Sequence, residues 1–209
     1  MARPIAKDHD LKRGAILKTA ARTFADEGFD RASMAGLARA CGISKSLIYH
    51  YYASKEALLF DILHTHLSAL KEAVDGVEGG ADPEADLRAV VHVILEAYRN
   101  ADAEHKLQLD ALGVLPAAER RTLEALQRDL VTLVSDALTR TAAPLFEARP
   151  EALRPAAMSL FGMLNWVYMW HRPKGGISRA EYADMATDLM LGGMERLARK
   201  AENNAAIAR

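Results

Sequence analysis

The sequence predicts an all-α fold of about nine helices, in which a small N-terminal three-helix domain precedes a larger helical domain. Apolar residues recur along most of the chain with the 3.6-residue period of an amphipathic helix, and almost nowhere with the alternation of a strand. Ser, Asp and Pro stand where these periodic segments begin, and Gly stands where several of them end. The 209 residues, 50% of them hydrophobic, can bury a substantial core.

The first helix is expected over residues 11–27. Leu17, Ala20 and Phe24 recur at spacings of three and four, which places them on one face. Gly28 follows directly and suits the left-handed conformation that ends many helices, so we expect the chain to turn there.

Two short helices joined by a tight turn are expected next. Ser33 can cap the first of them, in which Met34 and Leu37 lie on one face. Gly42 then permits a sharp turn, and Ser44 can cap a second helix of about two turns. The exposed face of this second helix is expected to carry Lys45, Ser46, Tyr49 and His50. This helix-turn-helix indicates DNA binding, and the alternative is a helical corner that never meets DNA.

Longer helices are expected over the middle of the chain. Ser54 caps one that continues to about residue 75. Asp82, followed by Pro83, begins another that continues to about residue 98. A short helix at 104–112 and a long one at 116–141 follow, the second opened by a proline.

Two helices are expected near the C-terminal end. Pro144 and Pro150 interrupt a connector, after which a helix is expected over residues 151–170, with apolar side chains around most of the circumference of its second half. Such a helix is expected to be buried on several sides. Ser178 and Glu181 form a capping box for a last helix that ends near residue 200, and the tail beyond it is expected to fray.

Charge is unevenly distributed along a chain whose net charge is −1. Residues 1–55 contain ten Lys and Arg against five Asp and Glu, whereas the other 154 residues contain seventeen against twenty-three. A basic segment on a mildly acidic body is typical of a protein that reads DNA with one domain and binds a ligand with another. The single Cys41 excludes an intrachain disulfide, and together with the lack of a long apolar segment it favours a cytoplasmic protein, nucleoid-associated when bound to DNA.

No catalytic or metal site is expected. The sequence contains neither G-x-S-x-G, nor H-E-x-x-H, nor a G-x-x-x-x-G-K-[ST] loop. His64 and His66 are two residues apart on a helix and therefore point to different faces, which makes them a poor metal pair. The chain is predicted not to be an enzyme and to need no cofactor. The alternative is a helical enzyme or a protein-interaction module that carries a helix-turn-helix.

The N-terminal residues resemble the DNA-binding domain of the tetracycline-repressor (TetR) family. The resemblance covers residues 11–59: F-A-D-E-G-F ends the first helix, the helix-turn-helix follows, and Y-H-Y-Y-A-S-K-E-A-L-L opens the fourth helix. It implies a helix-turn-helix DNA-binding domain at 1–54 and a helical ligand-binding and dimerisation domain at 55–209. It also implies a regulator, most often a repressor that a small-molecule effector releases from a palindromic double-stranded DNA operator.

The resemblance implies roles for side chains of the second short helix. Lys45 and Ser46 would face base edges, where a lysine can donate to guanine O6 and N7. Tyr49 would touch a thymine methyl group or the DNA backbone.

Other side chains would contact phosphates under the same resemblance. Ser33, Tyr51 and Lys55 are the expected anchors. His50 precedes Tyr51 here, where the family more often has an aromatic residue before a histidine, so the choice between these two stays open. The expected DNA-contacting set is Ser33, Ser44, Lys45, Ser46, Tyr49, His50, Tyr51 and Lys55.

A second motif, N-W-V-Y-M-W-H-R-P-K-G-G, occupies residues 165–176. Its W-x-x-x-W-x-R-P-x-G pattern resembles TetR-family members that respond to acyl-coenzyme A thioesters. Arg172 would suit a phosphate or carboxylate, and the aromatic rings an acyl or adenine group. Packing in the core or at a dimer interface is the alternative for the same residues. The expected effector-binding set is Phe161, Leu164, Asn165, Trp166, Tyr168, Met169 and Arg172.

A homodimer is expected because a recognition helix of about two turns reads few base pairs. A two-fold axis would place two such helices about 34 Å apart, or a multiple of that, on a palindrome. The last two helices, 151–170 and 178–200, are the expected interface. The expected contact stripe on the second is Tyr182, Met185, Leu189, Gly192, Gly193 and Leu197. The fourth helix, 54–75, joins both domains and is the expected lever between effector and DNA.

Overall fold

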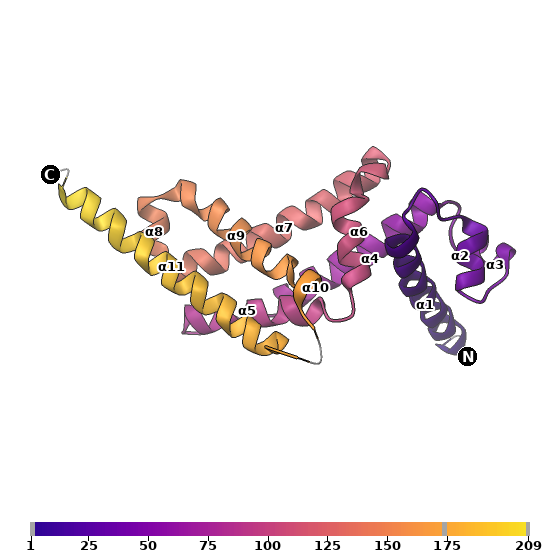
Figure 1. The fold of residues 1–209 in the computed structure, drawn as a ribbon, viewed down its shortest axis with the longest axis horizontal. Helices are drawn as coiled ribbons and strands as arrows, with labels where there is room; N and C mark the ends of the chain where they lie inside the picture. Colours follow the sequence, from indigo (N-terminus) through magenta and orange to yellow (C-terminus); the bar gives the residue numbers. More distant parts are fainter. Residues whose placement is uncertain (1–2, 173–174, 208–209) are drawn as a thin grey trace. The chain divides into compact units, whose positions relative to one another are not determined.

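The computed structural model describes residues 3–172 and 175–207, and all regular structure in these ranges is helical (Figure 1). The α-helices are α1 (Arg3–Glu27), α2 (Met34–Ala40), α3 (Lys45–Tyr51), α4 (Lys55–Asp75), α5 (Pro83–Ala97), α6 (Asp102–Asp110), α7 (Ala117–Thr141), α8 (Ala143–Ala148), α9 (Leu153–Asn165), α10 (Val167–Trp170) and α11 (Arg179–Ile207), with the 3-10 helices η1 (Leu112–Val114) and η2 (Pro150–Ala152). The all-α prediction is confirmed. None of the described helices combines the length and the apolar character that a membrane span requires.

The chain forms two compact units, and α4 and α7 each begin in one unit and end in the other. Unit 1 takes its described residues from Met1–Ser68 and Asn100–Ala125, and unit 2 from Ala69–Arg99 and Leu126–Arg209. Unit 1 therefore adds α6 and η1 to the N-terminal helices. Compactness does not assign function, so the functional boundary after residue 54 stays a prediction.

Serine caps begin the two short helices of unit 1, as the sequence predicts. Ser33 Oγ accepts a hydrogen bond from Gly36 N at 3.1 Å, and Ser44 Oγ accepts one from Leu47 N at 3.1 Å. Between the helices, Gly42 has φ +67°, a left-handed conformation in which a side chain would be strained. The helix-turn-helix is thus built from local signals that are legible in the sequence.

The first helix differs from its prediction at one end. α1 begins at Arg3 rather than at residue 11. The prediction relied on apolar periodicity, which the first turns lack, whereas Pro4 is a signal that could have placed the start, because proline suits the first turn of a helix. Ser54 begins α4 as predicted, and its Oγ accepts a hydrogen bond from Ala57 N at 3.2 Å.

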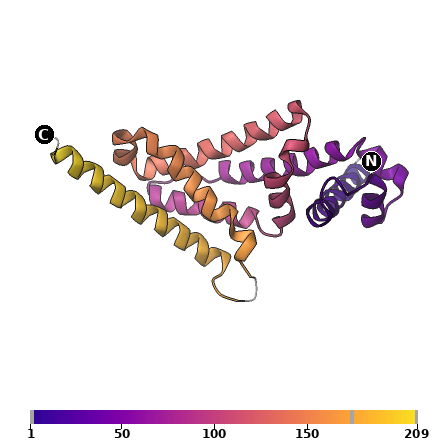
Figure 2. The same cartoon turned by 45° about the horizontal axis from the view of Figure 1, so that its top comes forward.

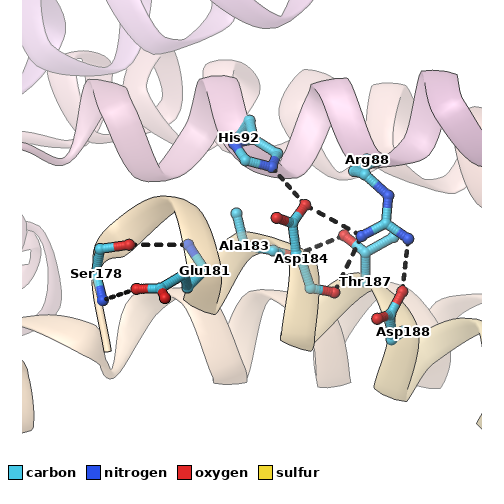
Figure 3. Close-up of polar contacts among 8 residues, drawn as sticks. All are labelled: Arg88, His92, Ser178, Glu181, Ala183, Asp184, Thr187 and Asp188. Carbon is cyan, nitrogen blue, oxygen red and sulfur yellow. Dashed lines mark hydrogen bonds and ion pairs between the residues drawn. The ribbon is translucent and has the colours of Figure 1, made fainter. Parts of the chain in front are cut away.

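In unit 2, α11 lies along α5 and α9 in both views (Figures 1 and 2). Polar contacts join α11 to α5 (Figure 3). Arg88 Nη1 donates to Asp184 Oδ1 at 3.1 Å, Arg88 Nη2 donates to Asp188, and His92 Nε2 lies 2.8 Å from the same Asp184 oxygen. The hydrogen bond with His92, followed by that with Arg88, lowers the pKa of Asp184. These pairs are partly exposed, so they orient α11 more than they stabilise it.

The predicted caps of unit 2 are also present. Asp82 Oδ1 accepts a hydrogen bond from Glu84 N at 3.0 Å at the start of α5. At the start of α11, Ser178 N donates to Glu181 Oε2 at 2.8 Å and Glu181 N donates to Ser178 Oγ at 3.1 Å (Figure 3). This reciprocal pair is the predicted capping box.

Three predictions in the C-terminal part are wrong. The expected connector contains α8, because Pro144 stands in the first turn of a helix, where proline promotes a start instead of a break. The expected single helix at 151–170 is divided, since α9 ends at Asn165 and α10 begins at Val167. α11 continues to Ile207 instead of fraying near residue 201, in keeping with the alanines of this stretch.

Candidate nucleic-acid interface and effector region

The recognition helix α3 presents one polar face to solvent. Lys45, Ser46, Tyr49 and His50 are all exposed, whereas Ile48 is completely buried. Lys45 Nζ lies 6.0 Å from the centroid of the Tyr49 ring, one turn further on, so the two side chains share the same surface. The structure thus places a cationic donor and a large aromatic ring together, as expected for contacts with base edges and methyl groups.

The capping serines can serve two purposes at once. Ser33 and Ser44 each accept a backbone N–H, which leaves a hydroxyl proton for another acceptor such as a phosphate oxygen. Ser44 Oγ also lies 3.0 Å from Ser46 Oγ, so only one of these two hydroxyl protons can be directed outward while they are bonded to each other.

The His50–Tyr51 pair is arranged asymmetrically at the end of α3. His50 is exposed, while Tyr51 is half-buried and stacks on His9 of α1 with ring centroids 4.8 Å apart. His50 meets the Tyr51 ring edge-on at 5.9 Å. His9 therefore joins this surface, although it lies more than 40 positions before Tyr51 in the sequence. No sequence pattern singles it out.

Lys55, a predicted phosphate contact, holds the loop between α1 and α2. Its Nζ donates to Phe29 O at 2.8 Å and to Asp30 O at 3.3 Å, and it lies 4.6 Å from the centroid of the Phe29 ring. An ammonium group has three protons, so one remains for a phosphate. The loop between α1 and α2 is thereby fastened to the start of α4, a function that the predicted phosphate contact did not anticipate.

A polar cluster lies behind α3. Tyr52, the residue directly after α3, donates its phenolic proton to Asp61 Oδ2 at 2.6 Å. Arg13 Nε donates to the same oxygen at 3.0 Å, and Arg13 Nη2 pairs with the other carboxylate oxygen. Burial, followed by the hydrogen bond to Asp61, raises the pKa of Tyr52, so the phenol keeps its proton. The hydrogen bond to Asp61 is also the main cause of the raised pKa of the Arg13 guanidinium.

The predicted effector residues separate into a buried and an exposed group. Phe161 and Leu164 belong to the core of unit 2, and Asn165 Oδ1 accepts a hydrogen bond from the buried Tyr98 hydroxyl at 2.9 Å. Asn165 and Tyr168 are half-buried, and the exposed members are Trp166, Met169 and Arg172. Pro173 and Lys174 of the same motif lie outside the described residues. The two groups lie on α9, on α10 and on the residues directly next to α10, and they are not gathered into one surface.

One partly open cavity, of about 360 Å³, lies in unit 1. Phe24, Phe29, Leu107 and Val114 supply its apolar walls, and Lys106, which donates to Ala25 O at 2.7 Å, also lines it. None of the predicted effector residues lines it.

A strip of large apolar side chains is exposed on α9 to α11. Its exposed fractions reach 56% at Trp166 and 59% at Leu189. The other strongly exposed members are Met158, Met169, Trp170, Met185 and Leu197. A methyl group added at Gly192 or Gly193 would meet no atom within 4 Å other than the adjacent backbone of α11 itself, so the backbone there is open to approach.

Comparison with known protein families decides the identity of the chain. Residues 16–62 match the model for bacterial regulatory proteins of the tetR family, and residues 80–194 match the model for the tetracyclin repressor-like C-terminal domain. The second match alone spans more than half of the chain. The chain belongs to the TetR family. This TetR-family protein is a DNA-binding transcriptional regulator, and α2 and α3 are its helix-turn-helix.

Solved TetR-family structures share the fold over most of the chain. A TetR-family transcriptional regulator from Bordetella parapertussis 12822 is 37% identical, with a TM-score of 0.79 over 86% of this chain and 93% of that one. AibR, in complex with isovaleryl coenzyme A and operator DNA, is 27% identical, with a TM-score of 0.70 over 85% of this chain and 97% of that one.

Among curated relatives, the HTH-type transcriptional regulator BetI of Agrobacterium fabrum is 33% identical over 88 residues, which is 42% of this chain. The match spans 43% of the length of BetI. Similarity to this regulator thus covers less than half of either protein.

Proposed function

We propose that this TetR-family regulator is a repressor that binds a palindromic operator as a homodimer and leaves it when a small-molecule effector binds. The observation that carries the proposal is the contrast between the buried and the exposed residues of α3. Ile48 is the one fully buried residue of this helix, while Lys45, Tyr49 and His50 face solvent. A helix with so little of its surface packed against its own unit is suited to insertion into a major groove.

Base recognition is assigned to Lys45, Ser46 and Tyr49. Lysine can donate to guanine, and the tyrosine ring can contact a thymine methyl group. Phosphate contacts are assigned to the capping serines, to Lys55 and to the His50–Tyr51 pair, of which the more exposed His50 is the readier donor. The DNA-binding domain then corresponds to residues 1–54, and effector binding and dimerisation to residues 55–209.

Dimerisation through α9 to α11 is supported by their exposed apolar strip. Leu189, Leu197 and Met185 are each more than two-fifths exposed in the single chain. A second copy related by a two-fold axis would cover the α11 members of this strip with the same residues, since such an interface is self-complementary. The open backbone at Gly192 and Gly193 permits close approach of the two α11 helices.

An acyl-coenzyme A thioester is the proposed effector. The support is the likeness to AibR, whose structure contains isovaleryl coenzyme A together with operator DNA. In this chain, Arg172 is exposed and offers its guanidinium for a phosphate, and Trp166 and Tyr168 offer rings for the acyl or adenine group. By binding residues 55–209, the ligand would favour a dimer in which the two α3 helices no longer fit successive grooves, with α4 as the lever.

Two experiments test the proposal in sequence. Selection of binding duplexes from a random-sequence library should yield two inverted half-sites whose centres are separated by about one helical turn or a multiple. Isovaleryl-coenzyme A and longer acyl-coenzyme A thioesters are then added to the complex with the selected duplex, and release is followed by fluorescence anisotropy. DNA binding without sequence preference would overturn the regulator's proposed operator, whereas specific binding that no thioester affects would overturn only the effector class.

A further inference from the structure

The recognition helix α3 has few anchors in unit 1. Ile48 is the one fully buried side chain of α3, and Tyr51 is half-buried against His9 of α1. The next buried side chain is Tyr52, directly after α3, which is 7% exposed. A second anchor fixes the direction of a short helix, so the way in which Tyr52 is held determines the angle at which Lys45 and Tyr49 are presented.

Tyr52 is held by a carboxylate on α4. Its hydroxyl donates to Asp61 Oδ2 at 2.6 Å, within the range of a charge-assisted O–H···O⁻ bond. Asp61 is itself held in place by Arg13 of α1, which donates to both carboxylate oxygens, and by Thr65 Oγ1 at 3.5 Å from Oδ1. All four residues belong to unit 1.

The hydroxyl of Tyr52 is not needed for packing. A phenylalanine would fill the same volume, and the ring would stay against Tyr51, whose centroid is 6.3 Å away. What the hydroxyl adds is a directional link between the end of α3 and one atom of α4. The bidentate guanidinium of Arg13, on α1, restricts rotation of the Asp61 side chain, so the carboxylate keeps one orientation on α4.

We propose that Asp61 is a positioning residue through which α4 sets the orientation of the recognition helix, with Tyr52 as the link and Arg13 as the clamp. The inference rests on the proposed operator binding and names the atoms through which α4 acts on α3. A displacement of α4 moves the Asp61 carboxylate, and Tyr52 carries that movement to the end of α3.

The test compares Tyr52→Phe with wild type in the full-length chain. The probes are the duplex that wild-type protein selects from a random library and a scrambled duplex of equal length and composition. Affinity for the selected duplex should fall about tenfold, equivalent to about 1.4 kcal/mol, while affinity for the scrambled duplex changes less than about twofold. The salt dependence should stay unchanged, because no phosphate contact is removed.

Thr141→Val is the matched control, since it removes a hydroxyl that donates to Pro83 O at 3.1 Å and Ala137 O at 2.9 Å in unit 2. Thr141→Val should lower thermal stability about as much as Tyr52→Phe does, without changing the ratio of the affinities for the selected and the scrambled duplex. Equal losses on both duplexes with Tyr52→Phe, or no loss on the selected duplex, would overturn the positioning role.

A double-mutant cycle provides a second, independent readout. If Tyr52 and Asp61 act as one unit, Tyr52→Phe combined with Asp61→Asn should lose no more affinity for the selected duplex than the more severe single variant. Additive losses of affinity would overturn the link between Tyr52 and Asp61. This result would count even if Tyr52→Phe alone proves less stable. Failure of wild-type protein to prefer any duplex would instead contradict the proposed function, so the two failures are distinguishable.

Discussion

Lys55→Met should destabilise unit 1 even in the absence of DNA. The substitution removes the hydrogen bonds from Nζ to Phe29 O at 2.8 Å and to Asp30 O at 3.3 Å, and the ammonium that lies 4.6 Å from the Phe29 ring. Hydrogen bonds to charged groups contribute about 1.5–3 kcal/mol and an exposed cation–π contact about 0.5–1 kcal/mol. Because Lys55 is partly exposed and the second bond is long, we expect a loss of about 2 kcal/mol in the free energy of unfolding.

The assay is thermal and urea unfolding followed by circular dichroism, with Lys55→Arg as the control that keeps the charge. For a chain of this size, about 1 kcal/mol shifts the melting temperature by about 2–4 °C, so a decrease of about 4–8 °C is expected for Lys55→Met. An unchanged melting temperature and urea midpoint would refute the reasoning, because the loop would then not depend on Lys55.

DNA binding by the same variant measures the other proposed contact of Lys55. Loss of one phosphate contact reduces the slope of log affinity against log salt by about 0.9. A destabilised variant with the wild-type slope would show that Lys55 holds the loop without contacting phosphate.

Three further predictions concern the dimer, the effector and pH. Leu189→Asp should raise the dimer dissociation constant at least about tenfold, measured by sedimentation, because a carboxylate would be buried at the proposed interface; an unchanged constant would place that interface elsewhere. Arg172→Ala should keep operator affinity in anisotropy titrations but weaken release by acyl-coenzyme A; loss of affinity without ligand would contradict this. Burial, aided by the charge of His105, lowers the pKa of His66 to about 4. Protonation therefore favours the unfolded chain, and stability should fall by up to about 3 kcal/mol as pH drops from about 6.5 towards 4. His66→Gln should flatten the urea-midpoint profile in that range, and an identical profile would exclude this origin.

Local sequence signals predicted the elements that local physics determines. Ser33, Ser44 and Ser178 begin helices because the side-chain oxygen of each accepts a hydrogen bond from a backbone N–H of the first turn. Gly42 turns the chain in the left-handed conformation that favours glycine. The exposed face of α3 was predictable for the same reason, because a helix of known start has known faces.

Contacts between distant residues could not be predicted in this way. Arg13 and Asp61 are 48 positions apart, and neither stands in a pattern that marks it among the other charged residues of α1 and α4. The stack of His9 on Tyr51 and the bonds of Lys55 to the loop carbonyls are of the same kind. Pairing of polar side chains is decided by how helices pack, which periodicity alone does not determine.

The apolar pattern of the C-terminal helices shows a second reason for incomplete prediction. α11 carries apolar residues on more than one face: Ala183, Ala186 and Met190 are buried in unit 2, whereas Met185 and Leu189 are exposed. Period and hydrophobicity are alike on both faces, so the sequence alone could not tell the core from an interface. Exposed apolar side chains such as Met185 and Leu189 favour a partner, and the open backbone at Gly192–Gly193 favours a second copy of α11 in that position.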